Sequence, residues 1–312
     1  MDRKNIRKKI AKLVKDFYKD PVKRNRNLLP ISNLSYGHEE VNAALEALLD
    51  GWISQGRNVQ NFESKFSKKI GTEFGVATNS GSSSNLVVLS ALKSIYGLND
   101  GDQVIVPAST FATVSMPVIQ VGLTPVYVDI NRHTLNIDTK ELQKAINDKT
   151  KILMPVHTLG LPCDMKIIME IAKKNNLIVF EDCCEAHGAS IDKKMVGSWG
   201  NVSAFSFFVA HNMTTGEGGM ILTDDEDLYI KCQSIREFGR IKVKEEPKSI
   251  YYSDEILKDY DRRYVFSDLG YNMRMTDICA ALGIEQTKKL DDMNGIRLRN
   301  ANYLRENFIT HY

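Results

Sequence analysis

Short apolar runs rich in β-branched residues recur from about residue 75, and amphipathic stretches separate them. The runs cover residues 104–106, 125–129, 152–156, 177–181, 204–208 and 220–223. The amphipathic stretches lie near residues 84–96, 139–147, 164–175 and 226–238. Strands that alternate with helices in this way are typical of an α/β domain with a mostly parallel sheet covered on both faces. The shortness and strong apolar character of the runs also fit strands that are buried on two sides.

The segments outside this alternation have different patterns. Residues 1–35 predict a basic helix followed by a loop, and a further helix ends at Gly51. Residues 240–263 are rich in charged and aromatic side chains without clear periodicity, so we expect a surface excursion such as an active-site loop. The stretch 275–308 is again helical in pattern.

Composition and charge narrow the class of protein. The 312 residues carry a net charge of +2, with 43% hydrophobic and 26% charged residues, as in ordinary soluble globular proteins. Charges of both signs are interspersed, so neither nucleic acid nor an anionic membrane is an expected partner. No apolar stretch is long enough to span a membrane, and the basic N-terminus lacks the apolar core of a signal peptide. We therefore expect a cytoplasmic protein.

The cysteines do not suggest a cross-linked or metal-binding framework. There are five of them, at Cys163, Cys183, Cys184, Cys232 and Cys279. An odd number in a chain of this size predicts no disulfide framework. No C-x-x-C pair occurs, so we expect neither a zinc site nor an iron–sulfur cluster.

Four short segments carry the candidate chemistry, and the first is residues 78–86. It follows an apolar run and opens an amphipathic helix with Gly81, Ser82 and Ser83. Hydroxyls and backbone N–H groups at a helix N-terminus suit a phosphate dianion. Taken alone, a serine-rich helix cap without a ligand is the simpler interpretation.

The second segment, residues 180–188, places carboxylates just past an apolar strand. Open α/β sheets bind ligands outside the carboxyl ends of their strands, where Asp182 is expected to lie. If the ligand is a pyridine ring, such a carboxylate keeps the ring nitrogen protonated. Without that ligand, Asp182 would be a helix cap and His187 a structural histidine.

The third and fourth segments are turns that lead into further elements. Residues 203–220 run from a strand through a polar turn containing His211 to a glycine-rich stretch, where the backbone can approach a ligand closely. A lone histidine in a loop is more often structural than catalytic. Residues 269–277 contain Asn272 and lead into a helix that Thr276 would cap.

These four segments, in this order and at these spacings, resemble the DegT/DnrJ/EryC1/StrS family of sugar aminotransferases. The resemblance covers nearly the whole chain, including GWISQG at 51–56 and PASTF at 107–111. It implies the aspartate aminotransferase fold, with an N-terminal helix and arm at 1–35 and a cofactor-binding large domain at 36–275. Residues 276–312 would begin a C-terminal small domain that is largely missing.

The resemblance also implies a pyridoxal or pyridoxamine phosphate cofactor and assigns residues to it by position. The cofactor phosphate is assigned to Ser82, Ser83 and Ser206. Phe111 would stack on the pyridine ring, and Asp182 would pair with the ring nitrogen. Asn272 would reach the phosphate of a neighbouring subunit, because the family builds its sites across a homodimer interface.

Two positions depart from the family's aminotransferases. Glu185 stands where many of them have glutamine, and His211 stands where they have the cofactor-binding lysine, five residues after Ser206. An imidazole cannot form the covalent link to pyridoxal phosphate that lysine forms. With an unperturbed pKa of about 6.5, it can still move protons near neutral pH.

With these two substitutions the chain resembles the sugar 3-dehydratase branch of the family. Members of that branch use pyridoxamine phosphate to remove the C3 hydroxyl of nucleotide-linked 4-keto-6-deoxyhexoses. His211 would then be the acid/base, with Asp182 and Glu185 completing the catalytic set. A place in deoxysugar or lipopolysaccharide biosynthesis follows from the resemblance. An aminotransferase that holds its cofactor non-covalently is the alternative within enzymes.

The nucleotide and the completeness of the chain stay open at this point. The branch includes a CDP-sugar enzyme with an iron–sulfur cluster and a GDP-sugar enzyme that regenerates its cofactor with glutamate. Residues 240–263, where clustered cysteines would be expected, contain none, so no iron–sulfur cluster is predicted. The chain stops at Tyr312, about where the small domain should start, so a truncated, non-catalytic relative is a further alternative.

Overall fold

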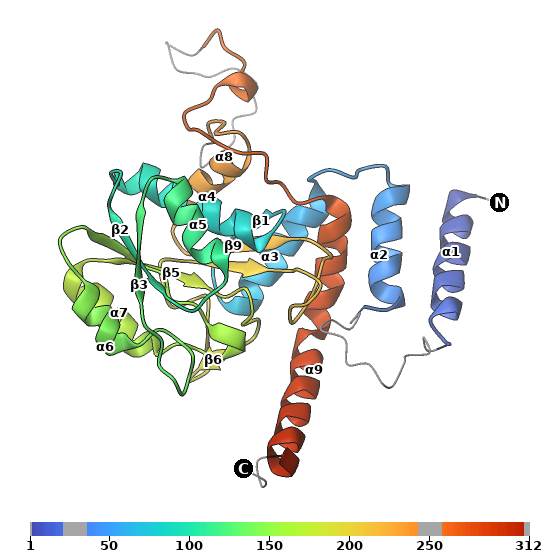
Figure 1. Ribbon diagram of the computed structural model, residues 1–312. Coiled ribbons are helices and arrows are strands. Elements are labelled where there is room, and N and C mark those ends of the chain that lie inside the picture. Colours follow the sequence, from blue (N-terminus) through green and yellow to red (C-terminus); the bar gives the residue numbers. More distant parts are fainter. Residues whose placement is uncertain (1, 21–35, 243–257, 309–312) are drawn as a thin grey trace.

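The computed structural model describes residues 2–20, 36–242 and 258–308, and a seven-stranded sheet lies at its centre (Figure 1). The strand order is β1-β9-β8-β5-β4-β2-β3. The bounds are β1 (Phe74–Thr78), β2 (Gln103–Pro107), β3 (Thr124–Val128), β4 (Thr150–Leu153), β5 (Ile178–Asp182), β8 (Val202–Ser206) and β9 (Gly219–Thr223). Only β9 runs antiparallel to its neighbours in this sheet, so the mostly parallel α/β fold is confirmed.

Helices cover both faces of the sheet. The first face carries α4 (Gly81–Tyr96), α5 (Ala112–Gln120) and α8 (Glu226–Arg236). The opposite face carries α3 (Arg57–Ile70), α6 (Thr139–Ala145), α7 (Met165–Asn175) and α9 (Asp277–Phe308). Successive residues of β2 show the reason, since Val104 and Val106 pack on the first face and Ile105 on the second. Strands buried on both sides need continuous apolar runs, which is the pattern that predicted them.

The N-terminal helix packs on the body of the protein. Helix α1 (Arg3–Phe17) lies beside α2 (His38–Leu49), and Arg7 forms ion pairs with Glu46 at 2.6 Å and Asp50 at 2.7 Å. The predicted loop that follows α1 falls on residues 21–35, which lie outside the described residues. Most of the predicted excursion at 240–263 also lies outside them, from 243 to 257; residues 262–264 form the short 3-10 helix η2 (Arg262–Tyr264).

Several predicted element boundaries were wrong. The run at 204–208 was predicted to be one strand, but β8 ends at Ser206. The N–H of Phe207 still bonds to the carbonyl of Gly218 in register with β9, and Phe208 forms only an isolated bridge with Gly216. The run at 152–156 extends past the end of β4, although Val156 still forms an isolated bridge with Asp182. Helices α3 and α5, the 3-10 helix η1 (Thr158–Gly160) and the small hairpin of β6 (Ser190–Ile191) and β7 (Lys194–Met195) were not predicted.

No helix within the described ranges combines the length and apolarity required to cross a bilayer.

The core between the sheet and helices α3 and α9 generates a stability prediction. Phe66 of α3 is fully buried, and its ring centroid lies 5.1 Å from those of Phe205 and Phe207. Replacing Phe66 by alanine removes these contacts and leaves a cavity, so the free energy of unfolding should fall by about 3–5 kcal/mol. Urea denaturation measures this change. The matched control is Phe17→Ala on α1, where the ring is 73% exposed and the change should stay within about 0.5 kcal/mol. Equal losses in the two variants would contradict the placement of Phe66.

Candidate functional site

The carboxyl ends of β1, β8, β5 and β2 meet at one edge of the sheet, because these strands all run in the same direction. Ser82 and Ser83 follow β1, while Ser206 ends β8. Asp182 ends β5, and Phe111 follows β2. The predicted candidates therefore come to a single edge from segments far apart in the sequence, as expected for a ligand site in an open α/β sheet.

The start of α4 is pressed against β8. A Cβ placed on Gly81 would lie 2.5 Å from Cβ of Ser206 and 3.0 Å from Sγ of Cys184, so glycine alone fits there. Ser80 caps the helix by accepting the N–H of Ser83 at 3.1 Å, and their hydroxyls lie 2.9 Å apart. This close approach brings the serines of the helix N-terminus next to Ser206. Hydroxyls and first-turn N–H groups of this kind can hold a phosphate.

Asp182 is a buried carboxylate that is held at both oxygens. Its side chain is at the end of β5, and the residue is 3% exposed. Oδ1 accepts the N–H of Cys184 at 3.0 Å, and Oδ2 accepts Nδ2 of Asn85 at 2.9 Å. Nδ2 of Asn85 also donates to the carbonyl of Thr113, at 3.0 Å, in the first turn of α5. The direction of the carboxylate is thus fixed by groups from α4 and from the turn after β5.

His211 lies half-buried in the turn after β8, where its N–H donates to the carbonyl of Phe208 at 3.0 Å. Burial lowers the pKa of its imidazole, while the negative charges of Glu185 and Asp182 act to raise it. Glu185 is exposed, and its Oε2 accepts the N–H of Leu159 at 3.0 Å. The imidazole is therefore neutral at neutral pH and lies within the field of two carboxylates, which suits a proton acceptor.

A closed ring of hydrogen bonds supports the turn that carries His211. Nδ1 of His187 donates to Oδ1 of Asn212 at 3.3 Å, since an amide oxygen can only accept. The carbonyl of Asn212 accepts Nη2 of Arg297 at 2.8 Å. Arg297 Nη1 then donates to Oδ1 of Asn294 at 3.1 Å, and Nδ2 of Asn294 donates back to the carbonyl of His187 at 2.8 Å. Side chains of α9 thereby hold the residue next to His211.

His187 itself has the features of a structural histidine. Its ring lies within 6.1 Å, between centroids, of Phe66, Phe205 and Phe207. Complete burial lowers its pKa to about 3, so its imidazole stays neutral and takes up no second proton near neutral pH. Its centroid is 6.4 Å from that of His211, and it supports that residue through Asn212.

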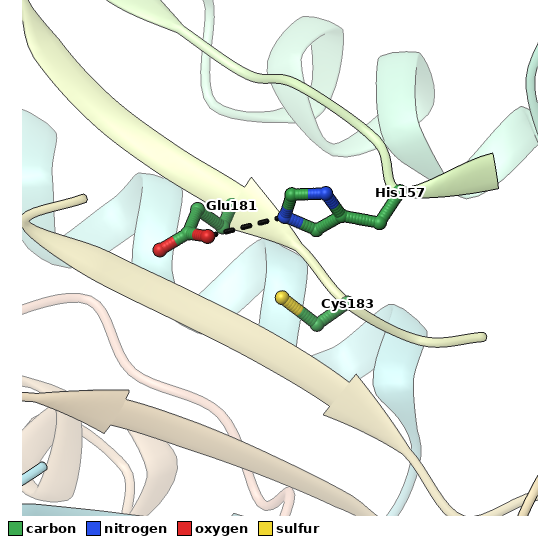
Figure 2. Close-up of side chains that lie close together, drawn as sticks. All are labelled: His157, Glu181 and Cys183. Atoms are coloured by element: carbon green, nitrogen blue, oxygen red, sulfur yellow. Dashed lines mark hydrogen bonds and ion pairs between the residues drawn. The ribbon is translucent and has the colours of Figure 1, made fainter. Parts of the chain in front are cut away.

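Glu181, one residue before Asp182, is the centre of a separate buried network. Figure 2 shows its side chain beside His157 and Cys183, with His157 Nε2 at 3.1 Å from Oε2. The two carboxylate oxygens also accept three backbone N–H groups, at 2.8–2.9 Å, from Gly197, Trp199 and Gly200. Glu181 thus ties the end of β5 to the loop before β8.

The same three side chains have the spacing of a metal site, with ligand atoms within 4.8 Å of one another. Their chemistry favours the hydrogen-bonded network instead. His157 Nδ1 accepts the N–H of Cys163 at 3.0 Å, so its proton is on Nε2 and points at Glu181. Burial raises the pKa of the Cys183 thiol well above its ordinary value, which disfavours the thiolate that a metal needs.

Phe111 and Asn272 lie at the periphery of this group. Phe111 is the N-cap residue of α5 and is 75% exposed, with its ring free to contact a ligand or another chain. Asn272 is exposed, and its Oδ1 accepts Nε of Arg274 at 3.1 Å. The adjacent carbonyl of Met273 accepts the N–H of Asn79 at 3.0 Å, so this segment runs beside the start of α4.

Sequence reasoning missed the supporting residues Asn85, Asn212, Asn294 and Arg297. Asn85 carried a detectable signal, because it is a polar residue on the mostly apolar, buried side of α4. The partnership of Asn212 with Arg297 spans 85 residues, and no local pattern indicates it. The interpretation of Thr276 as a helix cap fits the structure, since its Oγ1 accepts the N–H of Cys279 at 3.3 Å.

Solved structures define the class of protein to which this fold belongs. E. coli GDP-4-keto-6-deoxy-D-mannose-3-dehydratase with bound hydrated PLP matches 91% of this chain and 73% of its own, with a TM-score of 0.84 and 34% identity. 3-Amino-5-hydroxybenzoic acid synthase matches 89% of this chain and 68% of its own, with a TM-score of 0.77 and 29% identity. The chain therefore has the mixed α/β, aspartate aminotransferase-like fold that was predicted.

The family follows from the sequence comparisons. The DegT/DnrJ/EryC1/StrS aminotransferase family matches residues 35–310, and the chain belongs to it. The lipopolysaccharide biosynthesis protein RfbH of Salmonella typhimurium is 35% identical over 98% of this chain and 74% of its own length. Two further relatives are similar to almost the same degree. GDP-4-keto-6-deoxy-D-mannose 3-dehydratase of Yersinia pseudotuberculosis is 34% identical over 90% of this chain and 72% of its own length. GDP-perosamine synthase of E. coli O157:H7 is 35% identical over 89% of this chain and 71% of its own length. The predicted family is thus confirmed, and its relatives include two enzymes named for GDP-linked sugars.

The buried His187 generates a prediction of pH-dependent stability. The folded protein leaves this residue neutral down to about pH 3, whereas the unfolded chain takes up a proton below about pH 6.5. The unfolded state binds more protons between these values, so stability should fall as the pH drops below 6.5, by up to about 1.4 kcal/mol per pH unit. Urea unfolding of the wild type and of His187→Gln between about pH 7 and pH 5 measures the difference. Identical slopes in the two proteins would rule out a neutral buried His187.

Proposed function

We propose that this chain dehydrates a nucleotide-linked 4-keto-6-deoxyhexose at C3, with a pyridoxamine or pyridoxal phosphate cofactor, in deoxysugar or lipopolysaccharide biosynthesis. The observation that carries the proposal is His211, a neutral, half-buried imidazole in the field of Glu185 and Asp182 at the family's lysine position. The dehydratase relatives at 34% identity, one of them solved with bound hydrated PLP, support it.

The residues at the sheet edge fit such a cofactor. Asp182 offers a buried carboxylate, held at both oxygens, that can pair with a protonated ring nitrogen. The assigned phosphate contacts are Ser82, Ser83 and Ser206. Phe111 offers an exposed aromatic face for the ring. When bound, the cofactor supplies an amine for the sugar ketone and an electron sink for the reaction.

In this proposal the side chain of His211 moves the proton. Its imidazole cannot anchor the cofactor covalently, so the cofactor is held by non-covalent contacts. The lowered pKa leaves one ring nitrogen free to accept a proton from the C4′ carbon of the cofactor and later to give it to the leaving hydroxyl, which departs as water. Glu185, fixed by the N–H of Leu159, limits the loss of basicity that burial causes.

The remaining assignments go with this function. Glutamate is the proposed amino donor that restores the cofactor, and no iron–sulfur cluster is needed, since residues 240–263 contain no cysteine. We further propose a cytoplasmic homodimer, in which Asn272 of one copy reaches the cofactor phosphate of the other. The cofactor-binding large domain is proposed to span residues 36–275.

The first test is a product assay with pyridoxamine phosphate, glutamate and a panel of nucleotide-linked 4-keto-6-deoxyhexoses. We expect a 3-deoxy product by mass spectrometry, and a loss of rate of roughly 100-fold to 10,000-fold in His211→Asn. His133→Asn is the matched control, because His133 is exposed in the turn after β3, the outermost strand of the sheet. This control should keep the wild-type rate.

Other outcomes of the assay contradict the proposal. An amino-sugar product would instead support an aminotransferase, the activity named for the relative that is 35% identical, GDP-perosamine synthase. No product from any sugar, despite cofactor binding, would favour a non-catalytic role. Full activity in His211→Asn would remove His211 from the mechanism.

Glu185 generates a prediction about the pH profile. Its negative charge raises the pKa of His211, against the lowering by burial. Glu185→Gln keeps the side-chain shape and an oxygen for the N–H of Leu159 but removes the charge. The pKa of His211 should therefore fall further, and the acid limb of the kcat/KM profile should move to lower pH. Asp192→Asn, at an exposed hairpin position, is the control and should leave the profile unmoved. A limb that stays in place, or moves to higher pH, would contradict the role given to Glu185.

A further inference from the structure

Asn85 is an unusual residue for its position on α4. The buried side of this helix is otherwise built from Ser84 and from apolar residues, among them Val87, Val88, Leu89, Ala91 and Leu92. Asn85 is 1% exposed, in the first turns of the helix. Asparagine is a poor former of helix interiors, and its amide loses water on burial, so both effects oppose it here. A specific set of contacts must account for its presence.

The contacts of Asn85 are those of a dedicated donor. Nδ2 gives one hydrogen to Oδ2 of Asp182 at 2.9 Å and the other to the carbonyl of Thr113 at 3.0 Å. Among the residues that the structure describes, its buried Oδ1 has no hydrogen-bond partner. Turning the amide over would set this oxygen against two acceptors, so its orientation is fixed. The amide of Asn85 thus makes both hydrogen bonds of its Nδ2 group while its Oδ1 stays without a donor among the described residues.

The two acceptors belong to different parts of the sheet edge. Asp182 ends β5, and Thr113 lies two residues after Phe111 in the first turn of α5. Asn85 itself follows Ser82 and Ser83 at the start of α4, and α4 packs against α5 (Figure 1). One amide therefore joins the three segments that carry the proposed phosphate, ring-face and ring-nitrogen contacts.

We infer that Asn85 is a positioning residue that aims the Asp182 carboxylate at the ring nitrogen of a bound pyridine cofactor. The inference rests on the proposed function, since it takes pyridoxamine phosphate as the ligand. Without the amide, Oδ2 of Asp182 loses the donor that comes from α4, and the contacts left to the carboxylate among the described residues come from Cys184 alone. The carboxylate can then turn away from the ring. Asn85 does not touch the reacting atoms in this scheme; it acts through Asp182.

The test compares Asn85→Leu, which is similar in size and lacks the donor, with the wild type. We expect pyridoxamine phosphate to bind about tenfold more weakly, the loss of one hydrogen bond to a charged group. The NMR shift of the isotope-labelled ring nitrogen should move towards the unprotonated form at neutral pH. In turnover, kcat should fall while the KM for the sugar stays near its wild-type value. Asn85→Ser, with a shorter donor, should fall between the two and serves if the leucine variant does not fold.

Asn201→Ala is the control for a merely structural effect. It removes the acceptor of the Val179 N–H, 2.8 Å away, at the opposite end of the same strand β5. This variant should lose stability to urea without any change in cofactor affinity or in the ring-nitrogen shift. If Asn201→Ala changes the cofactor affinity and the ring-nitrogen shift as much as Asn85→Leu does, the inference is wrong.

The outcomes separate the inference from the proposed function. If the wild type fails to bind pyridoxamine phosphate, the proposed function fails, and the inference fails with it. If the wild type binds it, and Asn85→Leu and Asn85→Ser bind it equally well with the same ring-nitrogen shift, only the positioning role is overturned.

Discussion

Two carboxylates in succession, Glu181 and Asp182, end the central strand β5, and both are buried. Burial of a carboxylate is costly unless hydrogen bonds replace its hydration. Because side chains alternate across a strand, the two face opposite sides, and each has its own donors. Glu181 is surrounded by backbone N–H groups and His157, which makes it part of the framework. Asp182 is held by one N–H and the amide of Asn85, which leaves acceptor capacity for a ligand. The rest of the site is arranged around this second carboxylate.

The pKa of His211 is set by two opposing effects at the same edge of the sheet. Burial opposes the protonated imidazole, whereas Asp182 and Glu185 favour it. The turn that holds the ring in this balance is anchored from the other side by Asn294 and Arg297 of α9. The anchoring matters for the proposed role of His211 in proton transfer, because a ring in an unanchored loop would be exposed to water and lose the burial that lowers its pKa.

The sequence predicted those parts of the fold that depend on periodicity. The strands β2, β3, β5 and β9 are continuous apolar runs, and each was found within one or two residues. Helix α5 was missed because Pro117 lies within it and its apolar residues are not periodic enough to indicate a helix. The place of Asp182 could be predicted because parallel strands bring their carboxyl ends to one edge. The cofactor contacts of Ser82, Ser83, Ser206 and Phe111 were implied by the family resemblance and stay predictions. Asn85 and Arg297 could not be assigned, since their roles depend on partners 97 and 85 residues away.

Overall similarity does not distinguish dehydration from amination in this chain. The identity is 34% to a sugar 3-dehydratase and 35% to GDP-perosamine synthase, over nearly the same share of the chain. Relatives named for both activities share this family and fold, so the scaffold alone does not identify the reaction. The side chain at position 211 differs in chemistry from the lysine expected there in the family's aminotransferases. An amine can bond covalently to an aldehyde, whereas an imidazole can only accept and donate protons. The proposed dehydration therefore depends on His211, and the residues that set its basicity and hold its turn bear on that proposal more directly than the overall sequence identity does.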